Sequence, residues 1–251
     1  MIKKFILSLL PKEYFWALID FFKPKTFGQL GEDSVIENLI TWLGLDVSKK
    51  GKYIDIGAFH PTRGSNTFKF YKNGCNGYAI DIGERKKKIW NILRPRDIFL
   101  NTAVVQNSNT NEYTNFVMKD SYGSATDHIE KAGIIVNDNN SLNTIKVKTT
   151  TANQICDILH KDNNWINAPW KFISIDIEGM DEVFINDLDL IKLAPDIIAI
   201  EYFIPKNISF TDKISYILKC DLILNLKEKG FVLQSVCGPT LILVRIKSKK
   251  T

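Results

Sequence analysis

The sequence lacks the patterns that most directly identify a membrane-spanning protein or a dinucleotide-binding enzyme. No apolar run approaches the ~20 residues that a bilayer-spanning helix needs. Pro11 interrupts the apolar start of the chain, and no small-residue cleavage site follows it, so we expect no signal peptide. The G-x-G-x-x-G loop that cradles a pyrophosphate is absent, because only Gly57 and Gly64 occur where it would lie.

Cysteine is scarce, and charge of one sign is not concentrated. The chain has 4 cysteines, spaced neither as a zinc site nor as a disulfide scaffold: Cys75, Cys156, Cys220 and Cys237. This spacing indicates a reducing, cytoplasmic setting. The net charge of +5 comes from 33 basic and 28 acidic residues that are interspersed. The dense basic runs, at 84–88 and 247–250, are typical of solvated surfaces, so we expect no nucleic-acid partner.

Residues 1–50 are expected to form a helical N-terminal lead-in. Apolar residues recur at helical spacing in its first part: Phe15, Leu18, Ile19 and Phe22. A second helix is predicted from Asp33 to Leu43. The apolar face of this first helix has two possible partners. Packing on its own domain, or on a sister subunit of a homo-oligomer, is favoured over peripheral contact with a membrane surface.

Residues 51–251 show the alternation of strand and helix patterns that is typical of one α/β domain. Seven segments are strand candidates: Lys52 to Ile56, Gly77 to Ile82, Ile98 to Val105, Phe172 to Ile177, Ile197 to Glu201, Phe231 to Val236 and Leu241 to Ile246. Several are almost entirely apolar, as strands of a parallel sheet covered on both faces must be. The last two are separated by four residues, too few for a parallel crossover, so they are expected to pair as an antiparallel hairpin.

Residues 107–151 differ in composition from the rest of this domain. They are rich in Asn, Ser, Thr and Asp, and EYTNFVM and TIKVKT are two further strand candidates. We interpret this segment as an insertion that either covers a substrate site or is a plain surface loop. If it covers the site, His128 becomes a candidate substrate contact.

Polar residues follow the first strands at the edge where an open α/β sheet binds ligands. The first strand ends in Asp55-Ile56-Gly57-Ala58, where small residues let backbone N–H groups approach a ligand. The second strand ends near Asp81, whose carboxylate can accept the hydroxyls of a ribose. Without a phosphate loop, a nucleoside such as S-adenosylmethionine fits this pattern better than a dinucleotide.

A second polar group follows the strand in KFISIDIEGMDEVF. Residues two apart on a strand share a face, so Asp176 and Glu178 are expected to project together, with Glu201 at the end of the next strand. Clustered carboxylates cost stability unless a cation, a proton or a donor offsets their repulsion. The group therefore indicates a site, although carboxylates that cap the following helix are the structural alternative.

These segments together resemble the FkbM-type S-adenosylmethionine-dependent methyltransferases. The resemblance rests on YIDIGAFHPTRGSNTFKFYKNG, GYAIDIGE, AVV, ISIDIEGMDEVF and IIAIEYF, and it runs from about Gly28 to the C-terminus. It implies a Rossmann-like class I methyltransferase fold with a seven-stranded sheet. It also implies O-methylation of a sugar, surface glycan or related natural product. The residues that the resemblance places at the cofactor are Asp55, Gly57, Ala58, Asp81, Ala103 and Asp176.

Methyl transfer to a hydroxyl needs the reactants positioned and the hydroxyl proton removed. His60 is the leading candidate base, and Asp176 or Glu178 is the alternative. Asp176, Glu178 and Glu201 could instead hold a divalent metal ion, but we favour a mechanism without metal.

Substrate contacts and the class of protein leave further alternatives. Arg63 and Asn66 are candidate substrate contacts, although Ser65 to Phe70 also fits a helix start with Ser65 as its N-cap. A non-catalytic module for glycan assembly and an NAD(P)-dependent oxidoreductase are the other functions that this sequence pattern allows.

Overall fold

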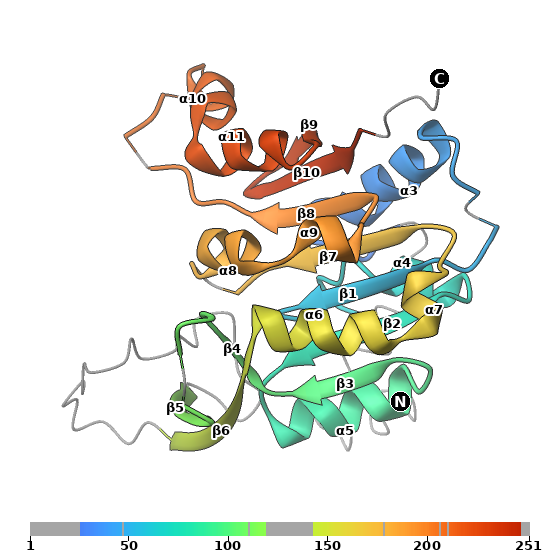
Figure 1. Ribbon diagram of the computed structural model, residues 1–251, viewed down its shortest axis with the longest axis vertical. Helices are drawn as coiled ribbons and strands as arrows, with labels where there is room; N and C mark the ends of the chain where they lie inside the picture. The colour runs from blue at the N-terminus through green and yellow to red at the C-terminus, as the bar shows by residue number, and fades with distance from the viewer. Residues whose placement is uncertain are drawn as a thin grey trace, which may run out of the picture.

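A seven-stranded, mainly parallel sheet with helices on both faces forms the centre of the protein (Figure 1). The computed structural model describes residues 26–46, 48–109, 111–118, 143–177, 179–205, 207–209 and 211–246. Its strands are β1 (Lys52–Ile56), β2 (Asn76–Asp81), β3 (Ile98–Asn101), β7 (Lys171–Ile175), β8 (Ile197–Glu201), β9 (Phe231–Cys237) and β10 (Thr240–Arg245). Their order is β3-β2-β1-β7-β8-β10-β9, and β10 runs in the direction opposite to the other six strands, so it is antiparallel to both β8 and β9. The expected parallel sheet with a terminal hairpin is thus confirmed, and it is compatible with a Rossmann-like fold.

Alternating apolar residues explain why the strands are covered on both sides. On β1, Ile54 and Ile56 join the core beneath one layer of helices, whereas Tyr53 joins the core of the opposite layer. The first layer contains α6 (Ala152–Lys161), α7 (Asn163–Ile166), α8 (Asp181–Asp187), α9 (Leu190–Leu193), α10 (Lys213–Lys219) and α11 (Asp221–Glu228). The opposite layer contains α3 (Glu32–Trp42), α4 (Phe68–Lys72) and α5 (Glu84–Leu93). Burial on both faces is what favours nearly continuous apolar strands.

A separate small sheet contains the segment that we interpret as an insertion. It consists of β4 (Ala103–Val105), β5 (Tyr113–Met118) and β6 (Asn143–Thr151) in the order β4-β6-β5. The two further strands expected there are confirmed as β5 and β6. The single strand expected from Ile98 to Val105 is wrong, because the chain leaves the main sheet at Thr102. The Thr102 hydroxyl donates to the Lys148 carbonyl oxygen at 2.8 Å, which directs the chain toward β6.

The helix predicted from Asp33 to Leu43 is confirmed as α3. The expected first helix, with its Phe15 to Phe22 repeat, lies outside the described residues, so its contacts stay predictions. The helix expected to begin with Ser65 as N-cap instead begins at Phe68, after Thr67. Among the described helices, none has both the length and the apolar character needed to cross a bilayer.

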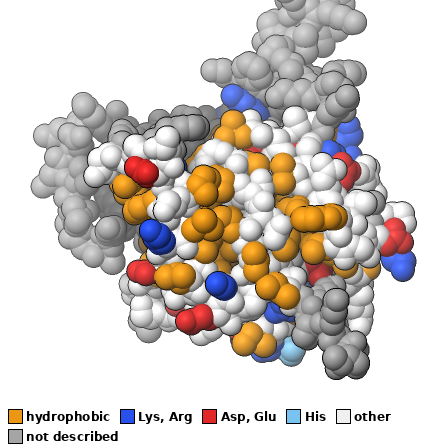
Figure 2. Space-filling model, turned by 90° about the horizontal axis from the view of Figure 1, so that it is seen from above, with side chains coloured by type: hydrophobic (Ala, Val, Ile, Leu, Met, Phe, Trp, Pro, Cys, Tyr) orange, Lys and Arg blue, Asp and Glu red, His pale blue; other side chains and the backbone are white. Residues whose placement is uncertain are grey.

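Hydrophobic side chains gather on the face formed around α10, α11 and the hairpin (Figure 2). Ile214 and Leu218 of α10 and Leu224 of α11 are exposed. On the described sheet, β9 is the terminal strand next to this face. Exposed apolar groups beside an edge strand suit an interface between subunits. The expected homo-oligomer nevertheless stays a prediction.

Candidate functional site

The strand order places a topological switch point between β1 and β7, where the loops after both strands meet. In such sheets, ligands bind beyond the carboxyl ends of the strands at this point. The N–H groups of Gly57 and Ala58 donate to the Ile80 carbonyl oxygen at 2.9 and 3.1 Å. The Asp176 N–H donates to the Ile56 carbonyl oxygen at 2.9 Å. The residues expected at the cofactor from three different strands therefore lie around one edge.

Gly57 is required by the close packing of these two loops. Its φ angle is +80°, a conformation that side chains rarely adopt. A Cβ atom at this position would also collide with the carbonyl oxygen of Asp176. The absence of a side chain at position 57 therefore has a structural cause, in addition to any approach of a ligand to the backbone.

Asp81, the candidate ribose acceptor, is paired with a lysine that our interpretation of the sequence missed. Lys86 Nζ lies 3.0 Å from both carboxylate oxygens, and the Ile82 N–H donates to Oδ1 at 2.6 Å. The 84–88 run was interpreted as a solvated surface, yet Lys86 is buried, with its ammonium 5.3 Å from the centre of the Phe59 ring. A lysine in the first turn of the helix that follows an acid-ended strand is the signal that points to this pair.

Asp55 lies beneath the loop that follows β1 rather than on the open edge. It is buried, and its carboxylate accepts the Thr67 hydroxyl at 2.5 Å. Burial raises the pKa of Asp55 to about 6, against the lowering effects of the Thr67 hydrogen bond and the Arg94 charge. Its expected role at the cofactor stays a prediction, and its contacts show that it also supports the loop.

Arg94 anchors that loop from below, and nothing in the sequence pattern singled it out. Its guanidinium is fully buried and is ion-paired with Asp97 at 2.7 Å. It also donates hydrogen bonds of 2.9 to 3.2 Å to these atoms: Tyr53 Oη, Thr67 Oγ1, Pro61 O and Ser65 Oγ. Three of these partners belong to the segment from Pro61 to Thr67, so one side chain fixes the conformation of the segment that contains Arg63 and Asn66.

His60 is positioned to build the loop. The imidazole is 3% exposed, and its Nδ1 accepts the N–H groups of Thr62 at 3.2 Å and Arg63 at 3.1 Å. Two backbone donors at Nδ1 require that this nitrogen carries no proton, so the proton of the neutral ring lies on Nε2. A base needs an unprotonated nitrogen that faces the acceptor. This geometry favours a role for His60 in loop structure, and its role as the base stays a prediction.

The other predicted site residues are distributed unevenly. Asn66 Nδ2 donates to Ser174 Oγ at 3.2 Å and so joins the loop after β1 to strand β7, whereas Arg63 is exposed. Ala103 is buried in β4, against Ile82 and Val147. His128 and Glu178 lie outside the described residues.

Three carboxylates gather at the ends of β7 and β8, but not as the strand pattern suggested. The interpretation that Asp176 and Glu178 share a strand face is wrong, because β7 ends at Ile175. The group contains Asp176, Asp181 and Glu201, with one oxygen of each within 4.8 Å of the others. Asp181 accepts hydrogen bonds from the N–H groups of Ile177 at 2.9 Å and Gly179 at 3.0 Å. These bonds stabilise the turn that precedes α8.

This group is of a size that could hold a divalent ion through oxygen ligands. Ca²⁺–oxygen distances of about 2.3–2.6 Å would allow oxygens roughly 5 Å apart on opposite sides of the ion. The structure also explains Asp181 without an ion, because its two oxygens each accept a backbone N–H group. Burial raises the pKa of Asp181, whereas these backbone hydrogen bonds lower it. Metal binding stays the untested alternative to the metal-free mechanism that we favour.

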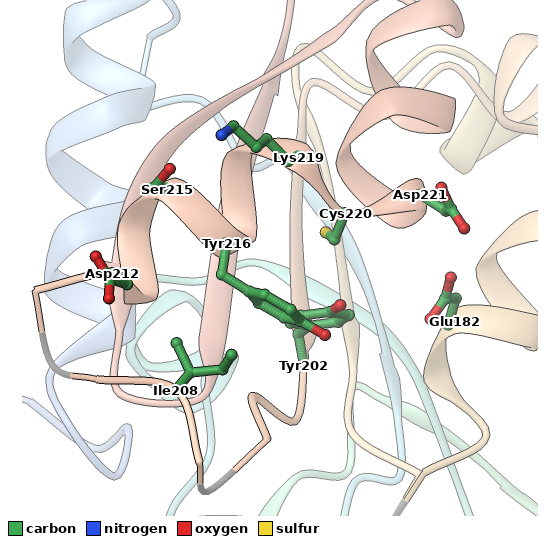
Figure 3. Close-up of a pocket in the computed structure, with 9 residues that line it drawn as sticks. All are labelled: Glu182, Tyr202, Ile208, Asp212, Ser215, Tyr216, Lys219, Cys220 and Asp221. Atoms are coloured by element: carbon green, nitrogen blue, oxygen red, sulfur yellow. The ribbon is translucent and has the colours of Figure 1, made fainter.

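A pocket of about 560 Å³ lies beside this carboxylate group (Figure 3). Tyr202 directly follows Glu201 of β8, and Glu182 directly follows Asp181 of α8, so the pocket and the group share their supporting elements. The remaining lining residues come from the segment after β8, from α10 and from the start of α11: Ile208, Asp212, Ser215, Tyr216, Lys219, Cys220 and Asp221. The pocket was not expected from the sequence, because its walls form only when α8, α10 and the start of α11 pack together.

A scan against protein-family models and a search of curated proteins find no match to this chain. A functional assignment therefore depends on the motifs at the sheet edge and on the geometry described above.

Proposed function

We propose that this protein is an S-adenosylmethionine-dependent methyltransferase that acts on a hydroxyl of a sugar, glycan or related natural product. The observation that carries the proposal is the strand order β3-β2-β1-β7-β8-β10-β9, with its switch point between β1 and β7. The resemblance to FkbM-type enzymes leads us to expect this mainly parallel, seven-stranded class I methyltransferase sheet. Two of the motifs that carry the resemblance include the loops after β1 and β7, at the switch point where such sheets bind ligands.

The residues at the edge fit a nucleoside that has no pyrophosphate. A carboxylate offers about four acceptor positions, and at Asp81 contacts from Lys86 and the Ile82 N–H already use three. A ribose hydroxyl would donate to the remaining acceptor position of Asp81, or ribose hydroxyls would displace the Lys86 ammonium. Gly57 and Ala58 provide a close-packed backbone next to this acid, without the glycine-rich loop that phosphates need.

The remaining task of the protein is to orient the acceptor hydroxyl and take its proton. When bound, S-adenosylmethionine supplies an electrophilic methyl group on a sulfonium. Asp176 is the better placed proton acceptor, because it is exposed at the end of β7, whereas Nδ1 of His60 is held by the loop. Glu201 lies in the same carboxylate group and can orient the hydroxyl.

Calorimetric binding of S-adenosylhomocysteine tests the proposal. Asp81→Asn should weaken binding roughly 10- to 100-fold, because hydrogen bonds to a charged acceptor contribute about 1.5–3 kcal/mol. Asp157→Asn, on an exposed acid of α6 whose ion-pair partner is Lys192 of α9, should leave binding unchanged. Asp176→Asn should abolish turnover with hydroxyl-bearing acceptors, both with and without EDTA.

Loss of an ion pair could also weaken the fold, so stability has to be separated from binding. The double variant Asp81→Asn with Lys86→Met removes both charges of the pair and should remain folded while still binding weakly. Folded protein that binds neither S-adenosylmethionine nor S-adenosylhomocysteine would refute the proposal. Binding of a nicotinamide dinucleotide instead would favour the oxidoreductase alternative.

A further inference from the structure

The pocket in Figure 3 carries an uneven distribution of charge. Glu182 of α8 and Asp221 of α11 point toward one another on one side of it. Lys219, the basic residue among the lining residues, extends from α10 away from these two carboxylates. Asp212 lies on the opposite side of the pocket, at the start of α10. The side between α8 and α11 is therefore the negative side.

Both carboxylates stand at the start of a helix, which is a structural reason for acidic residues at these positions. Glu182 lies in the first turn of α8 and Asp221 in the first turn of α11. A helix N-terminus carries roughly half a positive charge, so two such ends cancel about one of the two negative charges. At α8, the Asp181 carboxylate already accepts N–H groups of the preceding turn. The helix ends therefore leave a net negative field in the pocket.

The aromatic part of the wall is neutral and suited to a ring-shaped ligand. Tyr202 and Tyr216 lie together in the middle of the pocket, next to Cys220 (Figure 3). Tyrosine phenols are uncharged at neutral pH, because their ordinary pKa is about 10. Aromatic faces of this kind attract cations and pack against sugar rings.

We propose that this pocket binds a hydroxyl-bearing ring with a protonated amine, such as an amino sugar, whose ammonium group faces Glu182 and Asp221. The ring then packs against Tyr202 and Tyr216, and its hydroxyls point toward the carboxylate group at the ends of β7 and β8. That this ligand is the methyl acceptor rests on the proposed function. The preference of the pocket for a cationic ligand over an anionic one rests on the pocket alone.

Three sugars of different charge test the preference by ligand-observed NMR at low salt and neutral pH. Glucosamine should bind about tenfold more tightly than N-acetylglucosamine, and glucuronate should show no binding, because two carboxylates attract or repel the added charge. The difference should shrink as salt is added. Preference for glucuronate, or equal binding of all three sugars, would overturn the inference.

Variants test whether Glu182 and Asp221 cause the preference for glucosamine. Glu182→Gln together with Asp221→Asn should reduce the preference for glucosamine to within about twofold. Glu228→Gln, on an exposed acid of α11 that does not line the pocket, should retain the full preference. If the double variant keeps the preference, the amine does not bind between these two carboxylates.

A further ligand distinguishes an amino sugar from other amines. 1,4-Diaminobutane carries ammonium groups but no ring and no hydroxyls, so it should bind more weakly than glucosamine. Equal or tighter binding would refute the sugar-like part of the inference. The assay contains no cofactor, so its outcome is independent of the methyltransferase proposal. A protein that binds S-adenosylhomocysteine without an amine preference refutes this inference alone, and the reverse result refutes the proposed function alone.

Discussion

Replacement of Arg94 by Met should destabilise the protein strongly, because it removes one partner from a buried network of charge. Arg94 is 0% exposed, and its guanidinium is ion-paired with Asp97, whose side chain is 1% exposed. Asp97 would keep only neutral donors, the Tyr53 hydroxyl at 2.7 Å and the Gly77 N–H at 3.0 Å. Removing one partner of a buried ion pair costs about 3–5 kcal/mol.

That loss is large on the scale of a whole domain. Natural domains are stable by about 5–15 kcal/mol, and each kcal/mol changes the melting temperature by about 2–4 °C at 150–250 residues. We therefore expect the melting temperature of Arg94→Met to fall by roughly 6–20 °C. Arg94→Lys should fall less, because lysine keeps the charge but cannot reproduce the planar fork of hydrogen bonds.

Urea denaturation followed by circular dichroism measures the loss, and hydrogen exchange at the amides of Thr62 to Thr67 measures the release of the loop. Arg245→Met is the matched control, because Arg245 is half-buried and donates to the Leu190 carbonyl oxygen at 2.8 Å. Its loss should cost about 1 kcal/mol. If Arg94→Met costs no more than this control, the network does not stabilise the loop.

Two further changes test the site. Gly57→Ala should destabilise by at least ~2 kcal/mol and abolish S-adenosylhomocysteine binding, because the new Cβ meets the Asp176 carbonyl oxygen at a φ of +80°. Gly230→Ala, at a φ of +85° in open space, measures the backbone cost alone in the same denaturation assay, and equal losses would contradict the packing argument. For Asp55, the pKa is about 6 in the folded state against 3.8 ordinarily, so the folded state binds more protons between these values and stability falls as pH rises through them. The urea midpoint of Asp55→Asn relative to that of the wild-type protein should therefore rise between about pH 4 and pH 6. A difference in midpoint that does not change with pH would refute the raised pKa of Asp55.

Much of the fold could be predicted because a strand is recognisable from the apolar pattern of neighbouring residues. The alternation in Lys52 to Ile56 and the run from Ile197 to Glu201 require burial on two faces, and both became central strands. The four residues between the last two strands required a hairpin. The prediction failed at Thr102, because a threonine is acceptable in a continuous strand. The hydroxyl contact with Lys148, 46 positions later, accompanies the turn of the chain into a second sheet, where β4 pairs with β6.

The candidate site shows the same division between local and distant causes. The sequence by itself determined that Asp55, Asp81, Asp176 and Glu201 come at or next to strand ends, because strand length follows from the apolar runs. Only the tertiary structure decided what surrounds these acids. Asp81 is paired with Lys86, and Asp181 joins Asp176 and Glu201 in the carboxylate group, whereas Glu178 lies outside the described residues.

The same distinction explains Arg94, Gly57 and the pocket. A buried charge is recognisable only from the groups that compensate it, and those of Arg94 extend from Tyr53 to Asp97. Gly57 is confined by a carbonyl that lies 119 positions later in the chain, at Asp176. The pocket between α8, α10 and α11 depends on how helices pack on the finished sheet. Such contacts depend on strand register and helix packing, which emerge only when distant segments come together.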